Sequence, residues 1–151
     1  MQLGSIGLGL KHVKQLSTPC PKQLIAANYV QNLLASKTID SLKIEEANLV
    51  SMLSEYVEGS RELNTLGYVY LRAKELDKAM YVFDLNTKIF PYKHNVYDSL
   101  AEAYFETENY SEALKTYYKV LSMHPEDKNA PEMIAKITSE IESENKDDNK
   151  S

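Results

Sequence analysis

Cysteine and long apolar segments are scarce in this sequence of 151 residues. Its one cysteine, Cys20, has no second thiol for an internal disulfide and no partners at the spacing of a zinc ligand set. No apolar run reaches the roughly 18–20 residues that a membrane-spanning helix requires. The sequence therefore predicts neither a disulfide scaffold nor a membrane span, and it leaves the redox compartment open.

Basic residues are also in the minority, with 17 Lys and Arg against 22 Asp and Glu and a net charge of −5. Residues 1–39 carry four lysines and no acid, and acids outnumber bases over the rest of the chain. Proteins that bind phosphate backbones gather Lys and Arg on one face, and this sequence has no such cluster. Nucleic-acid binding is therefore not expected.

Sequence patterns of hydrolases are missing or poorly placed. Gly-x-Ser-x-Gly is absent, and Ser-x-x-Lys occurs once, at Ser143 and Lys146. That pair lies at the edge of a polar C-terminal segment, where nothing would hold a nucleophile beside its base. We interpret the match as chance and predict that the chain has no catalytic residue and is not an enzyme.

Candidate metal ligands are equally dispersed in the sequence. The chain has three histidines: His12, His94 and His124. None of them forms a His-x3-His or Cys/His pattern, so we interpret His94 and His124 as surface residues of turns. Three acids recur at intervals of four along one expected helix: Asp98, Glu102 and Glu106. Because no histidine accompanies them, they predict a charged helix face, and we expect neither a metal nor a cofactor.

What the sequence does contain is one pattern of residue types written twice at a constant offset. The first copy consists of Leu63, Leu66, Gly67, Tyr70, Ala79, Phe83 and Pro91. The second copy consists of Tyr97, Leu100, Ala101, Tyr104, Ala113, Tyr117 and Pro125. The first pair matches an apolar with an aromatic residue, and each of the other pairs is identical, small with small, or aromatic with aromatic. The offset between the copies is 34 residues. A fixed period of this length predicts stacked helical hairpins.

This period and residue order resemble the tetratricopeptide repeat (TPR) family. The resemblance implies an all-α fold, an α-α superhelix, with repeats at residues 60–93 and 94–127. We expect helices at 62–73, 77–90, 96–106 and 111–123, with Asp77 and Ser111 as N-caps and a proline after each hairpin. Small residues at Gly67 and Ala79, and at the two equivalent alanines, should let the paired helices approach closely.

The flanking segments complete a predicted total of about seven helices. Residues 1–20 are expected to be a flexible lead. Residues 21–59 predict a helical hairpin, with helices at 21–36 and 41–57, which is either a degenerate TPR or a plain cap. A closing helix is expected within 128–143, and residues 144–151 are expected to be a disordered acidic tail.

In the TPR family the first helix of each repeat lines a concave groove that takes a peptide or a helix of a partner protein. Carried onto this sequence, the resemblance implies these groove residues: Arg61, Asn64, Tyr68, Leu71, Arg72, Asn95, Asp98, Glu102, Phe105 and Glu106, with Glu132 and Lys136 from the closing helix. Three of them are acids of the second repeat. We therefore expect a partner that offers apolar anchors and basic residues.

One TPR subtype binds the C-terminal carboxylate of heat-shock chaperones through Lys, Arg and Asn at set positions. The residues at those positions here are Asn64, Tyr68, Ser99, Asn129 and Met133. None of them is basic, so a carboxylate clamp is not expected.

A narrower resemblance concerns residues 60–127. The phrases LGYVYL, FDLNTKIFP and NVYDSLAEAYF are similar to the C-terminal TPR tails of some bacterial serine hydrolases, β-lactamase-like and esterase-like, and Asn86 fits that subgroup. Two functions follow: a non-catalytic protein-interaction module, or a detached or truncated accessory domain of such a hydrolase. The first predicts a cytoplasmic location, and the second allows a periplasmic or secreted one.

Overall fold

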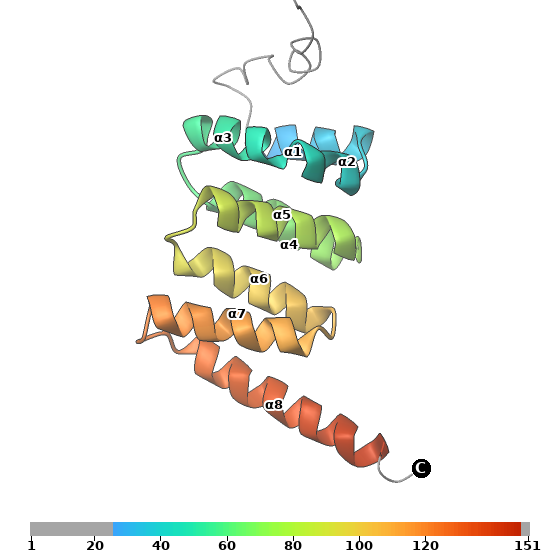
Figure 1. The fold of residues 1–151 in the computed structure, drawn as a ribbon, viewed down its shortest axis with the longest axis vertical. Coiled ribbons are helices and arrows are strands. Elements are labelled where there is room, and N and C mark those ends of the chain that lie inside the picture. The colour runs from blue at the N-terminus through green and yellow to red at the C-terminus, as the bar shows by residue number, and fades with distance from the viewer. Residues whose placement is uncertain (1–25, 149–151) are drawn as a thin grey trace, which may run out of the picture.

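A computed structural model describes residues 26–148 of the chain, which form eight helices and no strand (Figure 1). The helices are α1 (Ala26–Ser36), α2 (Ile39–Ile44), α3 (Glu46–Tyr56), α4 (Arg61–Arg72), α5 (Leu76–Ile89), α6 (His94–Glu106), α7 (Tyr110–Met123) and α8 (Asn129–Asp148). The expected all-α fold is confirmed. The predicted lead at 1–20 and the expected helix start at 21 lie outside the described residues.

The helices stack along the long axis of the molecule, with α1–α3 at one end and α8 at the other (Figure 1). Helix α4 pairs with α5, and α6 pairs with α7. Helix α1 packs beside α4, α2 and α3 pack beside α5, and α8 packs against α7. Each hairpin therefore buries its apolar side against the next, and the described chain is an α-α superhelix.

Close approach within the hairpins depends on the small residues of the repeat. Gly67, Ala79, Ala101 and Ala113 are all buried. A Cβ atom on Gly67 would lie 2.6 Å from the ring of Phe83, so α4 and α5 touch where only hydrogen fits. Phe83 and Tyr117 are fully buried at equivalent positions of the two hairpins. The small and large positions thus interlock as the repeat pattern predicted.

The turn inside each hairpin has the same conformation in both repeats. Lys74 and Glu108, which are equivalent positions of the two repeats, have φ angles of 60° and 59°. The next residues, Glu75 and Asn109, precede the first residues of α5 and α7 and make no side-chain capping bond. Both second helices begin one residue earlier than expected, so Asp77 and Ser111 lie inside the first turn and are not the N-caps.

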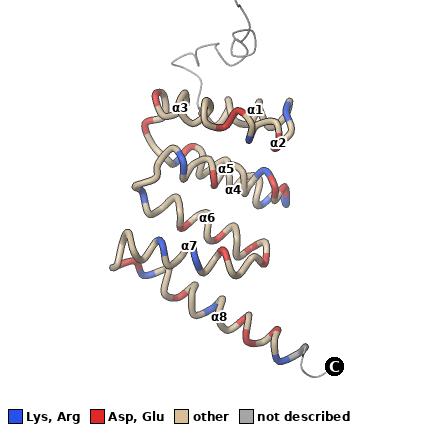
Figure 2. The backbone as a smooth tube through the Cα atoms, viewed as in Figure 1, with Lys and Arg blue, Asp and Glu red and all other residues tan. Residues whose placement is uncertain are grey.

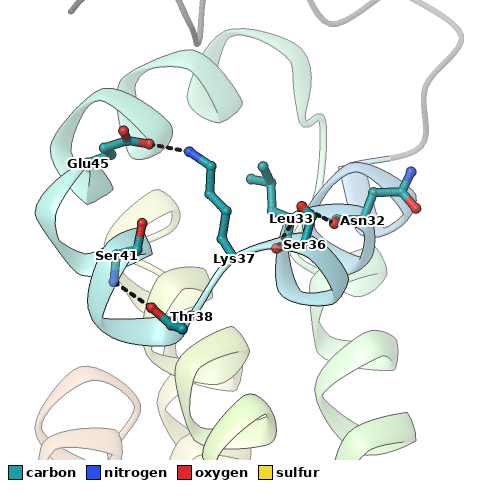
Figure 3. A network of polar contacts seen from close by, with 7 residues as sticks. All are labelled: Asn32, Leu33, Ser36, Lys37, Thr38, Ser41 and Glu45. Atoms are coloured by element: carbon teal, nitrogen blue, oxygen red, sulfur yellow. Dashed lines mark hydrogen bonds and ion pairs between the residues drawn. The ribbon is translucent and has the colours of Figure 1, made fainter.

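The expected single helix at 41–57 is broken at Glu45 into α2 and α3, which raises the number of described helices to eight. Thr38 caps α2 by accepting a bond from the amide of Ser41 at 3.3 Å, and Lys37 reaches across the turn to Glu45 at 2.7 Å (Figure 3). Glu45 stands exactly one repeat period before Ala79, the alanine at the α4–α5 contact. A long charged side chain does not fit such a contact, and the backbone turns at this residue instead.

Helix α8 continues to Asp148, beyond the predicted end at 143, so residues 144–148 are helical where the sequence predicts a disordered tail. The Asp127 carboxylate accepts a bond from the amide of Ala130 at 2.8 Å and thereby caps the helix start. Buried Ala130 and Ile137 hold the first half of α8 on the preceding hairpin. Glu142 precedes Lys146 by one helical turn, an order that favours helix continuation in the exposed half.

Candidate functional site

The predicted groove residues lie on α4 and α6, the first helices of the two repeat hairpins, and on the closing helix α8. Arg61, Arg72, Asn95 and Glu106 are exposed. The half-buried members are Asn64, Tyr68, Asp98, Glu102 and Phe105. Leu71 differs, because it is only 8% exposed and belongs to the buried apolar cluster that extends from α1 to α6. The expectation that Leu71 offers apolar contact to a partner is therefore not supported by its position.

Helices α4 and α6 are joined by a hydrogen bond between equivalent positions of the two repeats. The phenol of Tyr68 donates to the carboxylate of Glu102, one repeat period later, at 2.5 Å. The same phenol oxygen lies 3.4 Å from the hydroxyl of Ser99. Burial, followed by the bond to Glu102, raises the pKa of Tyr68, so the phenol stays neutral and keeps the proton that it donates to the Glu102 side chain.

The ring of Tyr68 is fixed on both sides. It meets the buried ring of Phe83 edge-on, with centroids 5.1 Å apart and an interplanar angle of 77°. The guanidinium of Arg72 lies 5.9 Å from the Tyr68 centroid. Tyr68 therefore links the packed interior of the first hairpin to a charged surface.

Helices α6 and α8 are joined in a similar way. The side-chain amide of Asn129 donates to Asp98 at 2.9 Å. Burial raises the pKa of Asp98, with the nearby Asp127 carboxylate acting in the same direction, while the Asn129 bond and His94 oppose the increase. Asp98 and Glu102 thus both serve as inter-helix acceptors. Of the three acids expected to form a charged face, only Glu106 is fully exposed.

Phe105 supplies the second aromatic group of this face. Its ring lies 5.8 Å from that of Tyr110, and the ammonium of Lys136, from α8, stands 4.5 Å from its centroid. Tyr68 and Phe105 therefore each carry a basic side chain of the same molecule over the ring. This arrangement combines cation–π contacts with acids on α6, which has three acids and no Lys or Arg (Figure 2).

A cleft of about 660 Å³ lies elsewhere, along α2 and α5, and none of the predicted groove residues lines it. Its lining includes three acids, Asp40, Asp77 and Asp84, together with Tyr104 of α6. Asp84 is bonded to Lys88 at 2.6 Å, and Lys88 also reaches Glu46 of α3 at 2.5 Å. The sequence does not predict this cleft, because the cleft forms where α2, the short helix before the break at Glu45, packs beside α5. The apolar periodicity of the sequence gives no sign of that break.

A second feature absent from the sequence expectations is a histidine pair. His94 begins α6 and His124 follows the last residue of α7, and their rings stack with centroids 4.3 Å apart and planes 10° from parallel. Asp127 lies beside them, 3.7 Å from His124. Metal-binding sequence motifs such as His-x3-His place their ligands on a single helix or turn. His94 and His124 lie at two different connections between hairpins, so no such motif indicates that they meet.

None of the described helices is long and apolar enough to cross a membrane. No family model and no curated protein matches the sequence. Among solved structures, the chain is similar to a point mutant of MamA, a TPR-containing protein, with 17% identity and a TM-score of 0.58. The likeness covers 78% of this chain and 83% of that one. The fold is TPR-like.

At this identity the likeness concerns the fold alone. The comparisons give no support to the narrower resemblance to serine hydrolase tails, which stays a prediction. The positions at which chaperone-binding TPR domains place Lys, Arg or Asn correspond to residues that include Tyr68, Ser99 and Asn129, and each of these is bonded to a side chain of a neighbouring helix. Their side chains are neutral and already engaged, so they offer a carboxylate no positive charge.

Proposed function

We propose that this chain is a non-catalytic scaffold that binds a peptide or helix of a partner protein on the face formed by α4, α6 and α8. The observation that carries the proposal is the pair of inter-helix bonds on this face, Tyr68 to Glu102 and Asn129 to Asp98. These bonds hold α4, α6 and α8 in a fixed arrangement before any partner binds. A preorganised surface loses less conformational entropy on association, which favours binding.

The chemistry of the face indicates the class of partner. Tyr68 and Phe105 are the aromatic groups, and Arg72 and Lys136 of the same chain lie over their rings. A basic side chain of a partner could replace either one over the ring while its charge faces the acids of α6. We therefore propose a partner segment that combines Lys or Arg with apolar anchors.

Selection from a displayed library of random linear peptides tests this proposal. We expect the enriched peptides to contain Lys or Arg together with aromatic or aliphatic residues, and to bind more weakly at high salt. Glu106→Lys should reduce their affinity roughly fivefold or more, because it replaces an attraction by a repulsion at an exposed site. Glu102 is unsuitable for this test, since its loss also removes the bond from Tyr68.

Glu55→Lys is the matched control, because Glu55 is exposed and lies on α3, which packs in the layer of second helices. It makes the same change of charge away from the proposed face and should leave peptide affinity unchanged. Peptides that bind both variants equally, or a selection that enriches acidic peptides, would contradict the proposed surface.

The alternative, an accessory domain of a bacterial serine hydrolase, is supported by the sequence phrases and by Asn86 alone. A neighbouring reading frame that encodes a Ser-x-x-Lys or Gly-x-Ser-x-Gly domain would favour it. Purified chain should show no hydrolase activity under either proposal, so the discriminating measurement is binding of that separate catalytic domain to this chain, with Glu106→Lys and Glu55→Lys compared.

A further inference from the structure

The histidine pair joins two turns that are separated by the whole second hairpin. His94 is the first residue of α6, and His124 and Asp127 belong to the turn between α7 and α8. One potential ligand atom from each of these three residues lies within 4.8 Å of the others. The fold thus brings an imidazole from one end of the hairpin to an imidazole and a carboxylate from the other.

Ordinary packing does not account for the polar atoms of this group. The Nδ1 atoms of His94 and His124 are both buried and have no hydrogen-bond partner among the described residues. Buried ring nitrogens are usually bonded. The Asp127 carboxylate caps α8 through Oδ1, while its Oδ2 stands 3.7 Å from Nδ1 of His124, beyond hydrogen-bond distance. Three potential ligand atoms therefore face one another without satisfying one another.

We propose that His94, His124 and Asp127 form a binding site for a divalent transition-metal ion, with Zn²⁺ as the representative. Imidazole nitrogen together with carboxylate oxygen suits Zn²⁺ and Cu²⁺, whereas Mg²⁺ and Ca²⁺ prefer oxygen ligands alone. Water would supply the fourth position. The Asp127 oxygen that caps α8 is not needed by the metal, because Oδ2 is the atom nearer His124.

Binding requires a small rearrangement that the site permits. Tetrahedral zinc at about 2.0–2.1 Å from each ligand places the ligand atoms roughly 3.3 Å apart. That spacing is closer than the 3.7 Å that now separates Asp127 from His124. The imidazoles must also turn out of their parallel stack so that each ring plane meets the ion. His94 is the first residue of α6, and His124 and Asp127 lie in the turn between α7 and α8. All three are partly exposed, so such rotations displace no core group. The bound ion would then clamp the start of α6 to the start of α8.

Titration of the metal-free full-length chain with Zn²⁺, followed by calorimetry, tests the proposal. We expect one ion per chain, weaker binding at lower pH because metal ligands must be deprotonated, and a higher melting temperature with zinc. His94→Gln, His124→Gln and Asp127→Asn should each weaken binding at least about tenfold. Asn at 127 retains an oxygen that can cap α8, so this variant separates the ligand from the cap.

Two controls use the same substitutions elsewhere: His12→Gln, the third histidine, and Asp77→Asn, an exposed acid of α5. Neither should change zinc affinity. Circular dichroism melts without zinc show whether each variant is folded. If Asp127→Asn is unfolded, the zinc affinities of His94→Gln and His124→Gln decide the outcome. Parent chain that binds Zn²⁺ no more tightly than the His94→Gln/His124→Gln double variant would overturn the proposal.

Discussion

Replacing Gly67 by alanine tests the closest contact in the fold. The added Cβ would lie 2.6, 2.7 and 2.8 Å from Cε1, Cζ and Cδ1 of Phe83, whereas carbon atoms pack best at roughly 3.5–4.0 Å. Phe83 is 0% exposed, so its ring cannot retreat into solvent. At a solvent-exposed position inside a helix, replacing glycine by alanine would stabilise the folded protein by about 1 kcal/mol. Overpacking a core costs about 1–3 kcal/mol, and we expect this term to win.

Because the added Cβ would meet three ring atoms, we place the overpacking cost in the upper part of its range, at about 2–3 kcal/mol. After the helix gain of about 1 kcal/mol is subtracted, the expected net loss in the free energy of unfolding is about 1–2 kcal/mol, measured by urea denaturation, with a melting temperature lower by roughly 3–6 °C. The reverse change at the equivalent site, Ala101→Gly, provides a matched comparison. It removes one buried methyl group, worth about 0.8 kcal/mol, and weakens the helix by about 0.8–1 kcal/mol. Both substitutions should therefore destabilise, although one adds a carbon and the other deletes it.

A double variant locates the clash. Phe83→Leu alone should destabilise through lost packing, but it also removes the ring edge that the new methyl group meets. Gly67→Ala/Phe83→Leu should therefore lose at least about 0.5 kcal/mol less than the sum of the single variants. A Gly67→Ala chain as stable as the parent, or strictly additive losses, would refute the close contact between α4 and α5.

Further predictions concern tyrosines. The Tyr81 hydroxyl is buried without a hydrogen-bond partner among the described residues, so Tyr81→Phe should leave stability unchanged or raise it by up to about 1 kcal/mol in urea denaturation. Tyr68→Phe loses the bond to Glu102 and should cost about 1–3 kcal/mol in the same assay. Burial raises the pKa of Tyr81 from 10.0 to about 12. The unfolded chain therefore loses this proton first, and stability should fall between these two pH values, less steeply in Tyr81→Phe; an equal slope in both chains would contradict the assignment.

The paired helices of the repeats were predictable because their determinants are local. Apolar periodicity, the small residues at Gly67 and Ala101, and the prolines at 91 and 125 mark both hairpins in the sequence. The break at Glu45 was not predicted, because apolar residues continue at helical spacing through it from Ile44 to Leu53 in the sequence. In the structure Ile44 is 86% exposed and does not share the buried side of α3. The one signal of the break in the sequence is that Glu45, a long charged residue, stands where the next repeat has the small residue Ala79.

The helices that carry the predicted groove residues could be predicted from the sequence, but the contacts of these residues could not. The family resemblance correctly placed Tyr68, Asp98 and Glu102 on the first helices of successive hairpins. It also assigned Leu71 to the surface, although the first hairpin buries it. The bond from Tyr68 to Glu102 has a signal in the sequence, because residues one period apart lie on adjacent helices. The His94–His124 contact has a weaker signal in the sequence. The two histidines lie at the two ends of the second repeat and are not one period apart.

Asn86, which the sequence analysis related to the serine hydrolase subgroup, also has a structural role in this fold. It is 0% exposed, and its side-chain amide donates to the backbone carbonyl of Ser60 at 3.0 Å. Ser60 precedes α4, so this bond ties the start of the first hairpin to the end of its second helix. The Ser60 hydroxyl also accepts a bond from Asn95 at 3.2 Å, which extends the connection to α6. The buried amide of Asn86 therefore has a structural role in joining these hairpins.

We therefore predict that Asn86→Ala lowers the free energy of unfolding by about 1–2 kcal/mol, through the lost bond and the space left behind. Asn95→Ala, which removes an exposed donor to the same serine, should cost about 0.5 kcal/mol or less. Urea denaturation of both variants measures the difference. If Asn86→Ala is as stable as the parent, the structural cause fails, and Asn86 regains its value as a marker of the hydrolase subgroup. If the loss is as large as predicted, the residue is explained by the fold and carries no evidence for an attached catalytic domain.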